Sequence, residues 1–404
     1  MKATLRCEAL GTEKSVAVED GIMLKSVICT AGSEILNNFT SPLTATVADK
    51  LADAGYAIAG TVQMDEFWLD RVTSDKEEIK SGAVEAVAAG ETSFALGNDL
   101  SGKLRRQAAQ ADLCYLHPTY GTVSRFGLVA AAASMDQIGV VAKTPDKAFE
   151  LLGVIAGHDN RDGAMFPETS YTYSPTGEGK ILVPDKLWEK APQEDRTAMA
   201  AFVAKLGVQS GFESYTKPNS DLESGRVCLP YFEHYAAVQY ILACAEISNN
   251  ISRFDGIKFG HRAENFRGLD ELYSKSRTEG FALEAKLCAL LGCLVLSEEY
   301  YTPYYDKSMR MRRLIRDSLL HLLRSENPRS DSSKNSDKLL GGYNLMLLPA
   351  RLEGTPFEQS AVYAAATLAG LPALSFSYEG GILQLIAAPK CENTLYSAWE
   401  VASR

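Results

Sequence analysis

The chain has 404 residues, of which 46% are hydrophobic and 23% charged. This balance is ordinary for a globular protein and excludes a disordered or low-complexity chain. The formal net charge is −10, which disfavours nucleic-acid binding through a broad basic face. No run of about eighteen uncharged apolar residues occurs, so no membrane-spanning helix is expected.

In the first half, short apolar runs at 16–18 and 56–60 predict strands, and the helical spacing between them predicts a helix over 45–55. This strand–helix–strand unit is typical of a sheet covered by helices. Further helices are predicted over 76–90 and 147–156, with a buried strand at 94–96 between them. Residues 162–178 are rich in Pro, Gly, Ser and Thr, which predicts a surface loop.

The second half resumes with a strand at 181–183 and a helix near 193–205. Long helices are predicted over 230–252, 279–298 and 302–325, and a polar loop over 327–342. The last of these helices carries a basic run at 309–316. We interpret it as the solvent side of an amphipathic helix, with a local nucleic-acid patch as the alternative. The chain closes with a strand at 345–349, a helix over 357–369 and strands at 373–376 and 383–386.

Cysteine and histidine spacing bears on cofactors and on the cell compartment. The eight cysteines are scattered without a Cys-x-x-Cys pair, which predicts reduced thiols rather than a disulfide framework or a zinc site. The five histidines are isolated, so no metal or other cofactor is expected. The first residues lack the apolar run of a signal peptide. These features together predict a cytoplasmic protein.

Several short motifs follow one another along the chain. Residues 97–108 have the sequence Gly-Asn-Asp-Leu-Ser-Gly-Lys-Leu-Arg-Arg-Gln-Ala, and residues 118–128 continue Pro-Thr-Tyr-Gly-Thr-Val-Ser-Arg-Phe-Gly-Leu. The others are Met-Asp-Glu-Phe at 64–67, Ser-Met-Asp-Gln-Ile-Gly at 134–139, Arg-Phe-Asp-Gly-Ile-Lys-Phe-Gly at 253–260, Ser-Arg-Thr-Glu-Gly-Phe at 276–281 and Leu-Ala-Gly-Leu-Pro at 368–372. In this order they resemble the amidase signature family, and within it the A subunit of glutamyl-tRNA(Gln) amidotransferase, from about residue 15 to residue 390.

The resemblance implies the family's α/β fold, which is an α/β/α sandwich with a large mixed central sheet. Length alone leaves either two subdomains or one large domain open. The resemblance favours a single domain over residues 1–404. It also implies that the family's N-terminal helical stretch is absent, because the chain starts almost at the first predicted strand.

Enzymes of this family use a lysine–serine–serine relay, in which the second serine attacks the amide carbon. The resemblance assigns Glu19 to the lysine position, Ile79 to the bridging serine and Lys103 to the nucleophile. Counting back twenty-four residues from Lys103, or back from the helix end at Gly90, reaches Ile79 in both cases. Since lysine cannot replace serine in this chemistry without a different mechanism, we expect all three catalytic positions to be lost.

The oxyanion turn and the substrate positions also depart from the family pattern. The turn Asp-x-Gly-Gly of the family becomes residues 99–102 here, so Asp99 and Gly102 remain while Ser101 replaces a glycine. At the positions that the resemblance assigns to charged groups binding the substrate stand Cys288 and Ser360. An amino-acid substrate would therefore meet no fixed countercharge.

A displaced nucleophile could rescue activity, and the candidates are Ser101, Ser81, Cys114 and Cys288. For each of them a structural role is favoured, because no base stands beside it in the sequence. The resemblance further implies that three retained residues brace the fold rather than catalyse: Ser124, Arg125 and Asp136.

The charged replacements suggest a specific hypothesis about the former active site. Glu19 and Lys103 occupy two ends of a relay that a small serine once bridged, so their long side chains could form an ion pair that fills the gap. Lys80 and Arg105 are further candidates for this pair. The alternative is two unrelated solvated charges.

These features predict a catalytically inactive amidase-like protein with a binding, scaffolding or regulatory role. Its partner is expected to be a protein of the amidotransferase-subunit type, and neither a membrane nor a nucleic acid is expected as a partner. Two alternatives stay open. One is an amidase or amidotransferase that uses a displaced nucleophile, and the other is a small-ligand binding protein in a remodelled cleft.

Overall fold

Strands from both halves of the chain join in one sheet in this computed structural model, which describes residues 4–5, 12–70, 80–175, 180–209, 213–215, 229–323 and 343–404. The sheet has eleven strands in the order β1-β3-β2-β4-β6-β5-β10-β11-β9-β7-β8. The strands are β1 (Thr4–Leu5), β2 (Ser15–Glu19), β3 (Ala57–Val62), β4 (Phe94–Asn98), β5 (Cys114–His117), β6 (Ile138–Ala142), β7 (Lys180–Leu182), β8 (Glu213–Tyr215), β9 (Leu345–Pro349), β10 (Ala373–Tyr378) and β11 (Gly381–Ala387).

The sheet is mixed, as expected. Strand β2 pairs in parallel with β3 and β4, whereas β4, β6, β5, β10, β11 and β9 pair antiparallel with one another in that order. Every residue of β2, β4, β6 and β9 is buried, which is what strands covered on both faces require.

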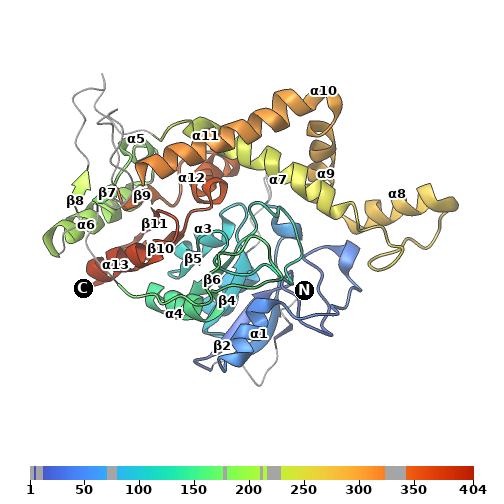
Figure 1. Cartoon of the computed structure of the whole chain (residues 1–404), viewed down its shortest axis with the longest axis horizontal. Coiled ribbons are helices and arrows are strands. Elements are labelled where there is room, and N and C mark those ends of the chain that lie inside the picture. The colour runs from blue at the N-terminus through green and yellow to red at the C-terminus, as the bar shows by residue number, and fades with distance from the viewer. Residues whose placement is uncertain are drawn as a thin grey trace.

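Helices lie on both faces of the sheet (Figure 1). Contacts link α1, α4, α13 and α6 in a series along one face, while α2 packs on α3 and α12 packs on α7. The principal helices are α1 (Thr46–Asp53), α2 (Gly82–Ala88), α3 (Lys103–Gln110), α4 (Pro145–Ile155), α6 (Gln193–Gln209), α7 (Tyr235–Ile251), α8 (Gly268–Gly280), α9 (Leu283–Val295), α11 (Lys307–Leu322), α12 (Pro356–Ala369) and α13 (Glu392–Ser403). The α/β/α sandwich predicted from the sequence is therefore confirmed.

Several predicted boundaries were wrong, each for a local reason. The helix predicted over 76–90 begins only at Gly82, because Ser81 is extended and its N–H donates to Gln107 Oε1 at 2.8 Å. The helix predicted over 279–298 corresponds to α9, which spans only Leu283–Val295, because residues 279–280 still belong to the preceding helix α8. The chain is extended at Ala282, whose N–H donates to Glu66 Oε2 at 3.1 Å instead of to a helical carbonyl.

The helix predicted over 302–325 starts earlier than residue 302. It begins with α10 (Glu298–Tyr300), which continues through a π-helical turn over Tyr301–Asp306 into α11. The predicted loop over 162–178 has no regular structure through residue 175, and the loop predicted over 327–342 lies outside the described residues. The chain also contains elements that the sequence pattern did not predict: α3, β5, β6, α8 and α13. In the described ranges, no helix combines the length and the apolarity that a membrane crossing would need.

Candidate functional site

Two parallel strands bring the candidate site together. Glu19 is the last residue of β2, and Asn98 is the last residue of the neighbouring strand β4. Since parallel strands end at the same edge of a sheet, Glu19 lies beside the turn 99–102 that follows β4. Helix α3 begins directly after this turn, at Lys103.

Glu19 is buried and held by two donors. Its Oε2 accepts hydrogen bonds from the indole Nε1 of Trp68 at 2.6 Å and from the Asn98 N–H at 3.0 Å. Removal from water raises the pKa of the Glu19 carboxyl to about 8, and these two hydrogen bonds oppose that rise. Gly97 beneath it has no room for a side chain, because a Cβ there would lie 2.7 Å from the Glu19 carboxyl carbon.

Trp68 closes the site from the side of the 310 turn Glu66–Trp68. Phe67 and Trp68 both adopt positive φ, at 50° and 57°, which is uncommon for residues other than glycine. The indole passes over Gly21, where an added Cβ would lie 2.4 Å from the ring. A locally strained turn thus directs an indole against a buried carboxyl group.

Lys103 forms an ion pair with Asp65, and each side chain is about 10% exposed. The direct Glu19–Lys103 ion pair suggested by the sequence is therefore wrong, because each of the two side chains has found another partner. Neither of the further candidates joins Glu19: Arg105 pairs with Asp99, and Lys80 is exposed.

The turn 99–102 is fixed by Asp99 and Gly102. Asp99 accepts from the Leu104 N–H at 2.9 Å and from Arg105 Nε at 2.6 Å, so its carboxylate caps the start of α3. Arg105 is fully buried and extends to α12, where it donates to the Tyr363 carbonyl at 3.0 Å. Gly102 has φ 93°, and an added Cβ would lie 2.2 Å from the Tyr363 ring.

The two serine candidates lie at the same place without a base bound to them. Ser81 lines the cavity beside Lys103, and its buried hydroxyl has no hydrogen-bond partner in the part of the chain that the structure describes. Ser101 lines this cavity as well, and within the described ranges no hydrogen bond to its hydroxyl is formed. Ile79, the third relay position, lies outside the described residues.

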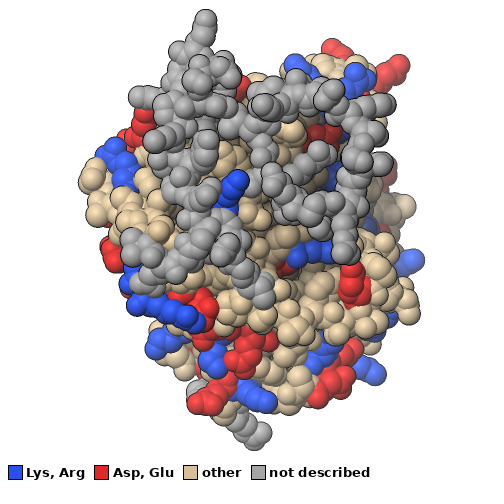
Figure 2. Space-filling model, turned by 60° about the vertical axis from the view of Figure 1, so that its left-hand side comes forward, with Lys and Arg blue, Asp and Glu red and all other residues tan. Residues whose placement is uncertain are grey.

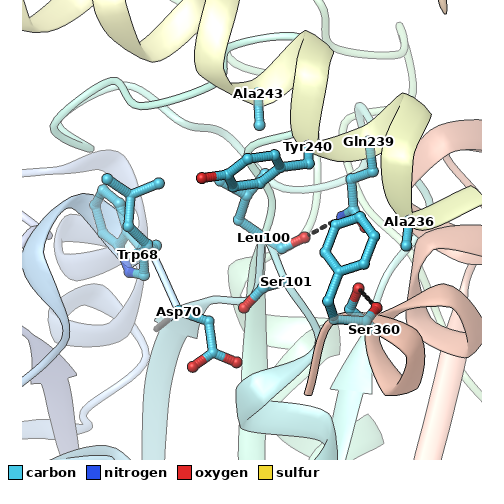
Figure 3. A pocket seen from close by; sticks show the side chains of 11 residues that line it. Trp68, Asp70, Leu100, Ser101, Ala236, Gln239, Tyr240, Ala243 and Ser360 are labelled. Carbon is cyan, nitrogen blue, oxygen red and sulfur yellow. Dashed lines mark hydrogen bonds between the residues drawn. The ribbon is translucent and has the colours of Figure 1, made fainter. Parts of the chain in front are cut away.

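The open space at the site is small and divided. The cavity lined by Glu19, Asp65, Ser81 and Lys103 has a volume of about 20 Å³. A second, mostly apolar pocket of about 60 Å³ adjoins it and shares Trp68, Leu100 and Ser101. Figure 3 shows Trp68 on one side of this pocket, Ala236 and Ser360 on the other, and Ser101 between them. Ligand pockets usually measure roughly 300–1,000 Å³, so both spaces are far below that range.

The remaining candidates, Ser360, Cys288 and Cys114, make contacts that fit a structural role. The Ser360 hydroxyl donates to the Phe357 carbonyl at 2.7 Å, within α12. Cys288 is buried between α9 and α7, where hydrogen bonding with Cys244 and burial both raise the pKa of its thiol. Burial likewise raises the pKa of the Cys114 thiol. Both thiols stay protonated, so neither is an activated nucleophile.

The residues expected to brace the fold make buried polar contacts. Asp136 accepts from Asn98 Nδ2 at 2.9 Å and so fixes the end of β4 beside Glu19. The Ser124 hydroxyl donates to Asp159 Oδ2 at 2.7 Å, and Arg125 pairs with Asp162 at 2.6 Å. These contacts tie loops to the sheet.

The basic run at 309–316 belongs to the solvent side of α11, as interpreted from the sequence. Arg310 and Arg313 pair with Asp306 and Asp317 one turn away, and Arg312 turns inward to donate to the Leu368 carbonyl at 2.9 Å. On the face shown in Figure 2, acidic and basic side chains are interspersed over the described surface. This charge pattern does not favour a nucleic-acid site there.

Sequence reasoning missed Asp65 and Trp68, although both stand in or directly after the Met-Asp-Glu-Phe motif. The sequence contained one signal for Asp65, because an acidic residue in a family motif is a natural partner for the lysine that stands at position 103. The position of Trp68 depends on the unusual backbone of the turn, which no spacing rule predicts.

The profile of the family described as Amidase matches residues 81–340. Among curated proteins, the glutamyl-tRNA(Gln) amidotransferase A subunit of Solidesulfovibrio magneticus is 37% identical over 329 residues, which are 76% of this chain and 65% of that protein. Its counterpart in Geobacillus thermodenitrificans is 35% identical over 373 residues, which are 84% of this chain and 75% of that protein. The chain thus spans slightly less than two thirds of the first relative.

Solved structures agree with the fold. The glutamyl-tRNA(Gln) amidotransferase A subunit of Thermotoga maritima matches with a TM-score of 0.69 and 26% identity, over 95% of this chain and 81% of that one. The 6-aminohexanoate cyclic dimer hydrolase matches with a TM-score of 0.70 at 17% identity, over 96% of this chain and 84% of that one, which supports the fold alone. The family match, the identity to these amidotransferase subunits and the mixed sheet agree, and the chain belongs to the amidase signature family.

Proposed function

We propose that this chain is a non-catalytic member of the amidase signature family that acts by binding another protein. The observation that carries the proposal is the environment of Lys103, the position assigned by resemblance to the nucleophilic serine. Its amine pairs with Asp65 in a cavity of about 20 Å³ that also contains the buried carboxyl group of Glu19. Among the described residues, neither of the two serines that line this cavity, Ser81 and Ser101, is hydrogen-bonded to a base that could activate it.

The proposed partner is another subunit of an amidotransferase. This inference rests on similarity, because the curated relatives are A subunits, and a subunit by its name works with others. The test is to coexpress the chain with the remaining subunits of a glutamyl-tRNA(Gln) amidotransferase from its own source. A stable complex at defined stoichiometry supports the proposal, and separate elution of all components contradicts it.

The second candidate is an amide hydrolase with a displaced nucleophile, favoured by one observation. The Ser81 hydroxyl is buried, has no hydrogen-bond partner among the described residues and lines the cavity that is also lined by Lys103 and Glu19. Ser101 lines both this cavity and the adjoining pocket. A fluorophosphonate probe separates the two candidates. We expect no labelling of the wild-type chain, whereas labelling that disappears in Ser81→Ala or Ser101→Ala would establish the hydrolase.

A small-ligand binding role is the weakest of the three. The pocket of about 60 Å³ is small and its lining is mostly apolar, so it offers few polar groups to orient a ligand. Thermal shifts with a panel of amides and amino acids test it, since a ligand at a hundred times its dissociation constant adds about 2.7 kcal/mol to stability.

A further inference from the structure

Exposed apolar side chains are concentrated in one part of the molecule. Of the thirteen large hydrophobic residues that are exposed in the described ranges, eleven lie between Ile257 and Leu314. This segment contains α8, α9, α10 and α11, which form the rim at the upper right of Figure 1. Where exposed apolar side chains form a patch, they mark a candidate interaction site.

Helix α9 is the centre of this surface because it is apolar on two opposite sides. Its inner side consists of Ala285, Cys288, Gly292 and Val295, all buried. Its outer side consists of Leu283, Leu287, Leu290 and Leu294, of which Leu283, Leu290 and Leu294 are 61%, 70% and 47% exposed. At 3.6 residues per turn the two stripes lie about 150° apart. A helix that is apolar all round is normally buried on both sides.

The inner side of α9 is fixed on α7. An added Cβ at Gly292 would lie 2.2 Å from both the Cys244 carbonyl oxygen and the Ser248 hydroxyl. Since α9 is seated this closely, it cannot rotate to bury its outer leucines against its own chain. These leucines therefore remain exposed among the described residues and are available to another molecule.

We propose that a second copy of this chain covers the stripe, with the two α9 helices antiparallel around a two-fold axis. The inference is independent of the proposed function. The leucines are spaced by four, three and four residues, which is the spacing of the apolar seam in a coiled coil. The sequence of intervals, four, three and four, is the same from either end of the helix. An antiparallel copy therefore places a leucine opposite each leucine. Leu287 then meets Leu290 of the other copy, and Leu283 meets Leu294, as an isologous interface requires.

The charges beside the seam fit this arrangement. In an antiparallel pair, Lys286 faces Cys293 of the other copy, and Glu284 faces Leu291, so no like charges meet. The helix dipoles also oppose one another, with the positive N-terminus of each α9 beside the negative C-terminus of its neighbour. A parallel pair would lose this compensation.

The buried area predicts a weak dimer. The three most exposed leucines leave the equivalent of nearly two full leucines uncovered in each copy. Burying a full leucine side chain contributes roughly 1.5–3 kcal/mol. The total for two copies is comparable to the roughly 4–15 kcal/mol that association costs. At the favourable end of both ranges the surplus is about 7 kcal/mol, so we expect a dissociation constant in the range from about 10 μM upward.

Sedimentation velocity of the full chain over a dilution series tests the proposal. The wild type should shift from monomer to twice the chain mass as its concentration rises. Leu290→Glu, which changes an exposed residue at the centre of the seam, should stay monomeric. The matched control is Leu269→Glu on α8, which is 56% exposed and outside the seam, and it should dimerise like the wild type. Circular dichroism checks that both variants are folded.

Cross-linking tests the antiparallel geometry. Lys286→Cys should give a covalent dimer with a short bismaleimide, because position 286 faces the exposed thiol of Cys293 in the other copy. Lys286→Cys combined with Cys293→Ser should lose the product. A wild type that stays monomeric at all concentrations, a Leu290→Glu variant that still dimerises, or a dimer without this cross-link would overturn the proposal. Formation of a complex through α9 only with an added foreign protein would overturn it as well.

Discussion

At the scale of single residues, the site is governed by how each buried charge is compensated. Among the described residues Glu19 has no cationic partner and accepts two hydrogen bonds, whereas Lys103 has a carboxylate partner in Asp65. Burial raises the pKa of the Glu19 carboxyl group, and the charge of the Lys103 amine is balanced by Asp65. Both arrangements occupy the space in which a relay would have to operate.

Glu19→Gln should stabilise the protein at alkaline pH. The pKa of Glu19 is about 8 in the folded chain, against 4.5 for a glutamate side chain in water, so the folded state binds more protons between these values. Stability from this group is therefore full below pH 4.5 and is lost as the pH rises through 8. Glutamine keeps an oxygen that can accept from Trp68 and Asn98 but carries no charge.

We expect the stability difference between Glu19→Gln and the wild type to be small at about pH 4.5 and to reach the order of a few kcal/mol at about pH 9. Urea unfolding across this pH range measures it. The matched control is Glu91→Gln at an exposed position, which should follow the wild-type profile. A pH-independent difference for Glu19→Gln would show that the carboxyl group is already ionised at low pH.

Lys103→Ser should destabilise the chain and restore no activity. It removes the largely buried ion pair between Lys103 and Asp65, which we expect to lower the free energy of unfolding by about 3 kcal/mol. Glu19 offers no amine to take a proton from the new serine. Chemical unfolding and an ammonia-release assay measure the two effects. Lys80→Ser is the exposed control, and Lys103→Ser with Asp65→Asn should recover much of the lost stability.

At the scale of elements, two helical glycines differ in how closely the neighbouring helix approaches them. Gly292 in α9 touches α7, while Gly207 in α6 has no heavy atom within 4 Å of an added Cβ. The same substitution at these two helical positions should therefore have opposite effects.

We expect Gly292→Ala to cost about 1–3 kcal/mol, because the methyl group must separate α9 from α7. Gly207→Ala should instead stabilise the chain by up to about 1 kcal/mol through helix propensity. Thermal and urea unfolding of both variants measure the difference. Equal effects of the two substitutions would mean that the contact between α9 and α7 is looser than described.

Element prediction from the sequence succeeded where hydrophobic periodicity and stop signals agree. The helix at 357–369 is α12, in which Thr355 and Glu358 form a capping box and Gly370 ends the helix with φ 68°. It failed at α3, whose start depends on Asp99, and at the break between α8 and α9, which depends on Glu66 from a distant segment. Local sequence patterns therefore predict helix ends that are set by capping residues, but not helix ends that are set by contacts with distant segments.

At the scale of the whole molecule, the motifs predicted the family and the sheet architecture correctly, since several ordered motifs specify one fold. The candidate site was predicted only in part. The positions of Glu19 and Lys103 beside one cavity followed from the motifs, but their partners did not. Asp65 and Trp68 reach the site through a turn with two consecutive positive φ values, which depends on tertiary packing.

The central claim is that the inherited fold holds no amide-cleaving machinery. It is tested most directly by ammonia release from glutamine by the purified chain, assayed beside an active A subunit of an amidotransferase. We predict a rate equal to that of the buffer, both with the chain alone and after Ser81→Ala and Ser101→Ala are introduced. Release above the buffer rate by the wild type that is abolished in either serine variant would contradict the account.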